Sequence, residues 1–504
     1  MTTLVASAGE TVVLPPSESL VDFYEVVPPF AYAAIVRDRR TGRMLYRVVE
    51  PPLSQSEVAV VEEVKRLLLE SQRPALEELR KRGVGEVLRE RMLAAVKRFK
   101  LPVPEEAVDK IYYYVKRDML GYGKLDVLVR DPFIEDISCD GVGVPVYVWH
   151  SRYESLPTSV VFENPEEMES ALVRLAHKAG KHISVANPIA EGSLPEGYRL
   201  HAALGEVARR GGSFTIRKFR EVPFSIVDLV KLGTVSLELA AYLWLVVESK
   251  KSLMVVGATA SGKTTTLNAI ATFIRPEAKI VTIEEVPELN LPHENWVPLV
   301  ARPSTDPWAR SVDLFDLLKS ALRMRPDYII VGEVRGEEAF TLFQAIATGH
   351  AGMCTMHAEN VDYAVKRLVS EPMNVPEFLV PLMNVFITIK RVAVGEKAVR
   401  RVIEVREALA GDRGPEWHTL YRYNPVEDKL ELVAKSRLLE TIAGERFIPA
   451  RELEEEAERR QAVLRFLIER SVTDYARVSR VVRDYALRPL AVYTAIERGL
   501  YDLR

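Results

Sequence analysis

One short stretch of the chain has the residue types and spacing needed to bind a polyphosphate. It fits the pattern G-x-x-x-x-G-K-[ST] and reads Gly257-Ala258-Thr259-Ala260-Ser261-Gly262-Lys263-Thr264. Residues 252–256 precede it with the length and β-branching of a buried strand, and residues 264–271 follow as a helix. A helix starting there points backbone N–H groups and a positive dipole end at one place. An accidental glycine turn is the alternative, but both flanking elements favour a phosphate-binding loop.

The last two residues of this loop have specific chemical roles. Lys263 would reach the β- and γ-phosphates, and the Thr264 hydroxyl would ligate Mg²⁺. We expect the whole loop, with Thr265 at the helix start, to bind the nucleotide. Hydrolysis also needs carboxylates, one to hold the water shell of the metal and one to orient or deprotonate the attacking water.

Acidic residues follow two predicted buried strands. The first group is Glu284-Glu285 with Glu288 one helical turn later, and the second is Glu333. Open α/β sheets bind ligands at the carboxyl ends of their strands, so both groups are candidates for this chemistry. For any one of these residues, a surface carboxylate without a catalytic role is the alternative.

Two histidines bracket the next predicted strand. They are His350 and His357. Such a pair is more often structural than functional, and no zinc is expected because no cysteine or histidine partners have ligand spacing. If the nucleotide site is granted, a histidine that donates a hydrogen bond to the γ-phosphate fits better.

Length and composition are ordinary for a soluble globular protein. The chain has 504 residues, of which 48% are hydrophobic and 28% charged, enough for about three or four domains. The net charge of −3 gives no bulk-charge argument for nucleic-acid binding. Cys139 and Cys354 form no disulfide framework, which fits a reducing cytoplasm. With no signal-peptide pattern and no apolar run of membrane-spanning length, we expect any membrane role to be peripheral.

Predicted strands and helices divide the chain into five segments. A hairpin and helices fill 1–104, a second α+β unit fills 105–218, and 219–235 link these to the fourth segment. In that segment, 236–405, strands and helices alternate, which predicts a parallel sheet covered by helices. Residues 406–504 form a mixed, mainly helical extension that could be a docking surface, a ring contact or a lid.

One amphipathic helix illustrates the local signals inside the nucleotide-binding segment. Leucines and a phenylalanine fall on one side of residues 312–323, and Ser311 could cap the helix start. Pro326 disfavours helix at the residue before it.

Four motifs in a fixed order resemble those of a known family. The phosphate-binding loop is followed by 283–288, 322–335 and 348–358, and together they look like the Walker A, Asp, Walker B and His boxes of the type II/type IV secretion ATPase superfamily. Upstream stretches resemble its archaeal branch of pilus-assembly, secretion and archaellum motor ATPases; they are 117–123, 134–141, 194–199 and 214–218. The resemblance covers about residues 25–405 and leaves the extension unexplained.

The resemblance implies a fold and an assembly. It implies an α/β fold in which a RecA-like P-loop domain with a twisted, mostly parallel sheet follows a smaller α+β, PAS-like domain and an additional N-terminal subdomain. The subunits would form a hexameric ring. ATP would bind in the RecA-like domain, at its interface with the N-terminal domain. Lys263 and Thr264 would hold phosphates and Mg²⁺, and Glu333 would be the Walker B acid that holds Mg²⁺ directly or through water.

The same resemblance implies roles for further residues. Glu285 stands where the family usually has Asp, and it and Glu288 are candidates for water activation. His357 would sense the γ-phosphate, with His350 in support. The extra methylene of Glu285 leaves open which glutamate of this box acts on water.

Two arginines upstream match family arginines that reach the phosphates from the N-terminal lobe. They are Arg199 and Arg217. A guanidinium suits this role because it is permanently charged and can bond two phosphate oxygens. Without the resemblance, a surface salt bridge is an equal alternative for each arginine.

The implied function is a Mg²⁺-dependent ATPase at the cytoplasmic face of the membrane. It would drive pilus-like assembly or protein secretion by pushing on a polytopic membrane partner. The alternatives are an archaellum motor, a nucleotide-gated scaffold that hydrolyses little, and a nucleic-acid translocase. The net charge of −3 and the lack of a basic, aromatic-rich stripe argue against the translocase.

Overall fold

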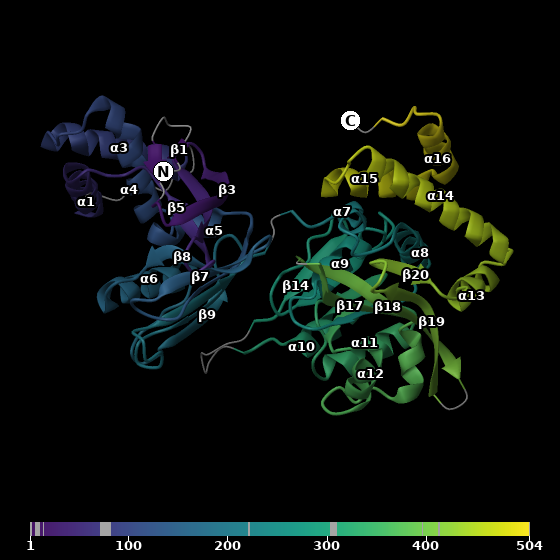
Figure 1. Ribbon diagram of the computed structural model, residues 1–504. Coiled ribbons are helices and arrows are strands. Elements are labelled where there is room, and N and C mark those ends of the chain that lie inside the picture. Colours follow the sequence, from purple (N-terminus) through teal and green to yellow (C-terminus); the bar gives the residue numbers. More distant parts are fainter. Residues whose placement is uncertain are drawn as a thin grey trace. The chain divides into compact units, whose positions relative to one another are not determined.

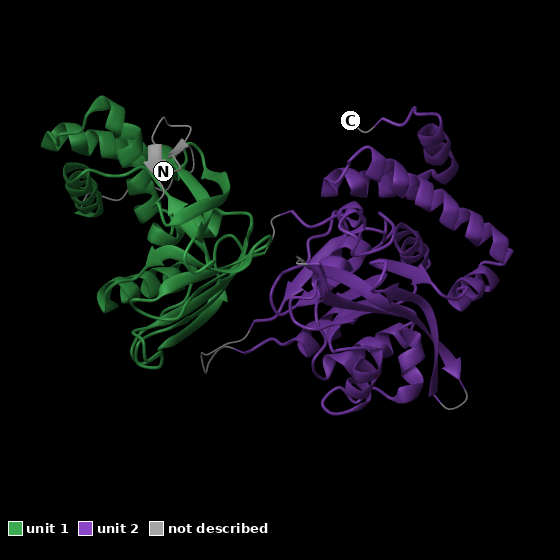
Figure 2. Ribbon diagram, viewed as in Figure 1, with its two compact units in different colours: residues 1–220 green, residues 221–504 purple. Residues whose placement is uncertain are grey.

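The chain forms two compact units, residues 1–220 and 221–504, coloured separately in Figure 2. The computed structural model describes residues 3–5, 11–13, 15–70, 82–219, 222–302, 310–395, 397–411 and 414–502. Within these ranges, no helix is both long enough and apolar enough to cross a bilayer. The finer division into five segments stays a prediction, and residues 220 and 221 of the expected linker lie outside the described residues.

The second unit is built on a nine-stranded sheet whose order is β14-β13-β15-β16-β12-β17-β18-β19-β20. Strands β14 to β17 are parallel along this order, and β17 to β20 are antiparallel, which confirms the mostly parallel α/β fold (Figure 1). All residues of β12, β13 and β15 are buried, as expected of strands covered on both faces. The strands are β12 (Leu253–Gly257), β13 (Ile280–Glu284), β14 (Trp296–Val300), β15 (Tyr328–Val331), β16 (Ala351–His357), β17 (Val385–Val394), β18 (Lys397–Gly411), β19 (Gly414–Asn424) and β20 (Lys429–Leu432).

Helices precede and connect these strands. They are α7 (Ile226–Lys231), α8 (Leu237–Glu248), α9 (Lys263–Ala271), α10 (Leu314–Leu322), α11 (Glu338–Ala347), α12 (Val361–Val369) and the 3₁₀ segment η3 (Glu377–Leu382). The helix predicted over 312–323 is present as α10, but its expected cap is wrong. Asp313 rather than Ser311 is the N-cap, because its carboxylate accepts the backbone N–H of Asp316 at 2.8 Å.

Among the described residues after β20, the C-terminal extension forms four helices packed on the same sheet domain. They are α13 (Arg437–Glu445), α14 (Ala450–Glu469), α15 (Tyr475–Leu487) and α16 (Pro489–Glu497). Helix α14 lies against α8, and apolar side chains of α13 to α16 belong to the hydrophobic cluster that also contains α8, α9 and β12 (Figure 1). The extension therefore shares one core with the predicted nucleotide-binding segment.

A buried carboxylate on β18 fixes the start of α13, the first of these four helices. Glu407 is fully buried. It accepts hydrogen bonds from the Tyr242 hydroxyl of α8 at 2.8 Å and from the backbone N–H groups of Arg437 and Leu438 at 2.9 and 3.2 Å. The Ser436 hydroxyl also donates to it. A buried charge needs such partners, so Glu407 joins α8, β18 and α13 at one point.

The first unit is built on a second nine-stranded sheet, of order β3-β4-β5-β8-β7-β6-β11-β10-β9. The predicted hairpin is confirmed as β4 and β5. The helices expected within residues 1–104 are confirmed as α1 and α3, and residues 71–81 between them lie outside the described residues. The strands are β3 (Glu18–Val27), β4 (Ala31–Asp38), β5 (Met44–Val49), β6 (Ile134–Cys139), β7 (Pro145–His150), β8 (Glu154–Val161), β9 (Ile189–Ser193), β10 (Arg199–Ala203) and β11 (Ser213–Arg217), beside a separate pair, β1 (Thr3–Val5) and β2 (Thr11–Val13). The helices are α1 (Gln55–Glu70), α3 (Val84–Phe99), α4 (Val108–Met119), α5 (Asp126–Arg130) and α6 (Pro165–Lys178), with short 3₁₀ turns η1 (Glu105–Ala107) and η2 (Gly123–Leu125).

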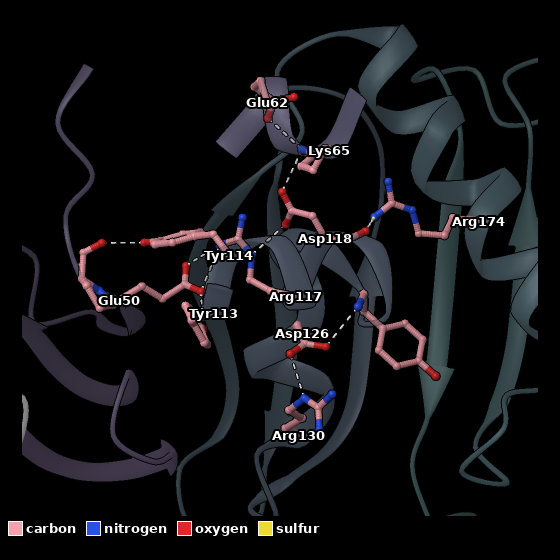
Figure 3. Close-up of polar contacts among 12 residues, drawn as sticks. Glu50, Glu62, Lys65, Tyr113, Tyr114, Arg117, Asp118, Asp126, Arg130 and Arg174 are labelled. Atoms are coloured by element: carbon pink, nitrogen blue, oxygen red, sulfur yellow. Dashed lines mark hydrogen bonds and ion pairs between the residues drawn. The ribbon is translucent and has the colours of Figure 1, made fainter. Parts of the chain in front are cut away.

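A network of charged residues ties helices α1 and α4 to the end of β5 (Figure 3). Arg117 on α4 pairs with Glu50 and with Asp118, each at 2.9 Å. The Tyr113 hydroxyl donates to Glu50 at 2.6 Å, and Lys65 of α1 pairs with Asp118 at 3.0 Å. Arg117 begins one of the stretches that resemble the archaeal branch, so this part of the resemblance lies at a structural junction.

We expect Glu407→Ala to destabilise the second unit by about 3 kcal/mol. The change would leave the N–H groups at the start of α13 and the Tyr242 hydroxyl without their acceptor in the core. Urea unfolding measures the effect. Glu416→Ala, which removes an exposed carboxylate from β19, is the matched control and should shift the midpoint little. Equal midpoints for the two variants would contradict the role given to Glu407.

Candidate functional site

The phosphate-binding loop joins the central strand β12 to helix α9. Two glycines are required by its geometry. A Cβ at Gly257 would lie 2.5 Å from both the Ile389 carbonyl and the Ser261 hydroxyl oxygen, and Gly262 has a φ of 95° immediately before α9. The loop therefore turns tightly enough to place α9 directly behind it, with the N-terminus of α9 at the loop.

Lys263 lies folded back over this loop. Its Nζ donates to the Ala258 carbonyl at 2.9 Å, and the Ser261 hydroxyl donates to the same carbonyl at 2.8 Å. Lys263 is 9% exposed, whereas Thr264 and Thr265 in the first turn of α9 are half-buried. An ammonium, a hydroxyl and a helix N-terminus thus meet at one place, as binding of a metal-bound polyphosphate requires.

Glu333 stands beside this loop and is bridged to Glu285 by an arginine. Glu333 follows β15, and Glu285 follows β13, which pairs with β15 in parallel. The Arg335 guanidinium lies 2.8 Å from Glu333 Oε2 and 3.2 Å from Glu285 Oε2. Burial alone would raise the pKa of Glu333, but the hydrogen bond and charge of Arg335, with the charges of Lys263 and His357, lower it overall. Glu333 is therefore ionised at neutral pH and interacts with Lys263 and His357.

His357 ends β16 next to the loop, because β16 pairs with β12 so that Gly257 lies opposite His357. Its Nε2 accepts the backbone N–H of Thr259 at 3.1 Å and lies 2.9 Å from the Thr259 hydroxyl. Accepting an N–H leaves the ring proton on Nδ1. Burial and the charge of Lys263 lower the pKa of His357, so the ring is neutral at neutral pH.

The three glutamates after β13 have different environments. Glu284 is buried, and its Oε1 accepts the backbone N–H groups of Glu288 and Leu289 at 2.9 and 3.0 Å. Its carboxylate thus folds the segment that comes after the strand. Glu285 and Glu288 are exposed. Of these two, the one joined to Glu333 through Arg335 is Glu285.

The buried position of Glu284 changes its acidity. Burial raises its pKa to about 7, the two backbone N–H groups oppose this shift, and the nearby Glu288 adds to it. Part of the Glu284 population is therefore protonated at neutral pH. This behaviour suits a structural carboxyl group that is out of contact with solvent.

The structure does not bring His350 to the loop. His350 precedes β16, and its Nδ1 lies 3.0 Å from the Ala345 carbonyl at the end of α11. The seven residues that separate it from His357 span about 23 Å along an extended strand. Within the second unit, the expected support of His357 by His350 is therefore not present, because the two lie at opposite edges of the sheet.

Arg199 and Arg217 lie in the first unit. They are exposed and directly opposite each other, on the neighbouring antiparallel strands β10 and β11. Arg217 also lies opposite Asp136 on the neighbouring strand β6. The pKa of Asp136 is raised overall, because the effect of burial exceeds the opposing effect of the Arg217 charge. The two guanidinium groups thus come from one edge of a single sheet. Their part in nucleotide binding stays a prediction.

Three further arginines contact the site but were given no role from the sequence. Arg335 bridges the two glutamates, Arg367 of α12 donates to the His357 carbonyl, and Arg400 of β18 donates to the Ala260 carbonyl at 3.2 Å. Arg335 lies within the Walker B-like stretch, so its position two residues after Glu333 was a usable signal. The other two come from distant segments, and local spacing carries no signal for them.

We expect the stability of the second unit to fall as pH rises from about 5 to 8, partly through Glu284. A carboxyl group whose pKa is higher in the folded state holds its proton more tightly there. Stability is therefore lost as pH rises from the pKa of the carboxyl group in the unfolded chain toward its folded pKa of about 7. Glu284→Gln removes the part of this pH dependence that Glu284 contributes. Relative to wild type, the variant should gain up to about 3 kcal/mol between pH 5 and 8. Urea midpoints across this range measure it.

The control for this experiment is Glu294→Gln, which removes an exposed carboxyl group nearby and should leave the pH dependence unchanged. If wild type and Glu284→Gln kept a constant stability difference across the range, Glu284 would not titrate near neutral pH.

Known proteins resemble this chain over much of its length. A family model described as "Type II/IV secretion system protein" matches residues 143–405. An uncharacterised protein of Methanocaldococcus jannaschii is 39% identical over 391 residues, which cover 76% of this chain and 71% of that protein. The type IV secretion system protein PtlH of Bordetella pertussis is 38% identical over 177 residues, which cover 32% of this chain and 52% of that protein.

Two solved structures are also similar. The VirB11 ATPase of the Brucella suis type IV secretion system is 25% identical with a TM-score of 0.29, covering 56% of this chain and 92% of that chain. The pilus retraction motor PilT with bound ADP is 18% identical with a TM-score of 0.38, covering 72% of this chain and 93% of that chain. Because the family model spans more than half of the sequence and the M. jannaschii relative is similar over most of both proteins, this chain belongs to the type II/IV secretion system protein family.

Proposed function

We propose that this chain is a Mg²⁺-dependent ATP hydrolase. The observation that carries the proposal is the meeting of Lys263, Glu333 and His357 at the carboxyl ends of three adjacent parallel strands. A cation for phosphates, an ionised carboxylate and a neutral imidazole are the groups that phosphoryl transfer to water uses. A nucleotide-binding site without hydrolysis would use the cation, and the carboxylate to hold Mg²⁺, but it would not need the imidazole.

The residues of the chain divide this work among them. The loop amides, the α9 N-terminus and Lys263 bind and orient the phosphates. The Thr264 hydroxyl and the Glu333 carboxylate are hard oxygen donors of the kind that Mg²⁺ prefers, and they would hold it. When bound, Mg²⁺ neutralises charge that develops on the phosphates. Glu285 orients the attacking water, and His357 contacts the γ-phosphate.

We further propose that hydrolysis drives mechanical work in a secretion or pilus-type machine. Family membership supports this role, and the site described above is where ATP would be hydrolysed. The proposed assembly is a hexameric ring on the cytoplasmic face of the membrane that acts on a polytopic membrane protein. Arg199 and Arg217 would reach the phosphates from the first unit and so link nucleotide state to the position of that unit.

We expect Lys263→Ala to reduce phosphate release from Mg-ATP by about 10²-fold or more, because a preorganised cation at the phosphates is lost. Phosphate release by the purified full-length chain measures it. Lys429→Ala, which removes a lysine whose side chain is 71% exposed on β20, should leave the rate unchanged. A wild-type chain that binds ATP but releases no phosphate would favour the nucleotide-gated scaffold. DNA-stimulated turnover with a steep salt dependence would favour the translocase.

We expect Glu285→Gln to lower kcat by about 10²-fold, and Glu288→Gln to lower it less than about threefold. The difference arises because Glu285, through Arg335, lies beside Glu333, whereas the backbone of Glu288 is used to fold the segment. The two variants are matched in chemistry and in exposure, so each is the control for the other. The reverse order of effects would assign water activation to Glu288.

A further inference from the structure

The C-terminal extension reaches the elements that carry the proposed site through one hydroxyl group. Tyr475, the first residue of α15, is 7% exposed, and its hydroxyl donates to the Asn290 carbonyl at 2.8 Å. The same hydroxyl accepts a hydrogen bond from Asn268 Nδ2 at 3.3 Å. Asn268 Oδ1 in turn accepts the backbone N–H of Asn290 at 2.9 Å. These three residues form a closed bridge between segments far apart in the sequence.

The two asparagines of the bridge lie in or next to the elements of the proposed site. Asn268 is 2% exposed and lies in α9, five residues after Lys263, or about 7.5 Å along the helix axis. Asn290 ends the segment that Glu284 folds and that contains Glu285. The bridge therefore connects the helix that would bind phosphates to the segment that would orient water, and Tyr475 of the extension completes it.

The surroundings make the bridge rigid. Leu289 and Leu291 on either side of Asn290 are 5% exposed and lie in the same hydrophobic cluster as α9, α14 and α15. Burial raises the pKa of the Tyr475 hydroxyl, although the hydrogen bond from Asn268 lowers it, so the group stays protonated and can donate at neutral pH.

The extension itself is anchored independently of this bridge. Arg460 of α14 is 3% exposed and pairs with Glu248 of α8 at 2.7 Å. Its guanidinium also lies 5.0 Å from the centre of the Trp244 ring, and the Tyr485 hydroxyl donates to Glu456 at 2.9 Å. Because these contacts hold α14 and α15 against α8, the Tyr475 hydroxyl is not needed to keep the extension in place.

We propose that Tyr475 is a positioning residue through which the C-terminal extension sets the geometry of the ATPase site. It fixes the segment that carries Glu285 relative to the helix that carries Lys263. The proposal rests on the proposed ATP hydrolysis and assigns the extension a part in it. Loss of the hydroxyl would leave phosphate binding by Lys263 intact but would let Glu285 depart from its working position, so kcat should fall and KM should not.

The test compares two tyrosine-to-phenylalanine variants of the full-length chain. Tyr475→Phe keeps the ring and removes the bridging hydroxyl. Tyr485→Phe makes the same change at a fully buried tyrosine of the same helix, whose hydroxyl donates to Glu456 of α14. We expect Tyr475→Phe to lower kcat about fivefold with KM for ATP within about twofold, as loss of one hydrogen bond would do. We expect kcat of Tyr485→Phe to stay within about 1.5-fold, although its unfolding midpoint falls at least as far.

A double-mutant cycle with Asn268→Ala tests whether the effect passes through the bridge. If it does, the combined variant should lose little more kcat than the more damaging single variant. Wild-type kcat for Tyr475→Phe, or losses of kcat that merely track the unfolding midpoints of both phenylalanine variants, would overturn the proposal. Absence of hydrolysis by wild type would instead refute the proposed function, so the two failures are distinguishable.

Discussion

The parallel pairing of β12 with β16, and of β15 with β13 and β16, is the constraint on which the site depends. Parallel strands send all their carboxyl ends to one edge of the sheet. Gly257 therefore lies opposite His357, and Val331 lies opposite both Cys354 and Ile283. Each motif that comes after a strand is delivered to the same edge, whatever its distance along the chain. Residues that precede a strand, such as His350, are delivered to the other edge by the same rule.

Charge balance explains how so many ionisable groups share this edge. Arg335 contacts both Glu285 and Glu333, and the charge of Lys263 also acts on Glu333. Arg367 and Arg400 bring two further cations, which donate to backbone carbonyls of His357 and Ala260. The neutral form of His357 avoids a further cation next to Lys263. Glu284 takes no part in this charge balance because it is buried. Its carboxyl oxygen accepts backbone N–H groups instead and so folds the segment 284–290.

The extension after residue 436 is part of this domain in the physical sense that it shares its core. Its apolar side chains join the cluster of α8, α9 and β12, and two buried charged residues, Glu407 and Arg460, join it to β18 and α8. Buried charges that are paired favour one docked position over others, because displacement would separate each charge from its partner. Because the extension is held in one place, its contacts can fix the position of α9. A segment tethered only by its chain connection could not do so.

The sequence by itself determined the phosphate-binding loop, its flanking strand and helix, the order of the four motifs and the α/β class. These features depend on spacing and periodicity within short windows. Strands β14, β17 and β19 went unpredicted, although β17 carries a run rich in β-branched residues. The cap of α10 fell on Asp313 because cap geometry depends on the path of the chain into the helix.

Only the tertiary structure decided that Glu284 is buried while Glu285 contacts Arg335, that His350 lies away from the loop, and that Tyr475 meets α9. The physical reason is that burial and hydrogen-bond partners arise from segments that pack together across long stretches of sequence, and local patterns do not encode which segments will meet.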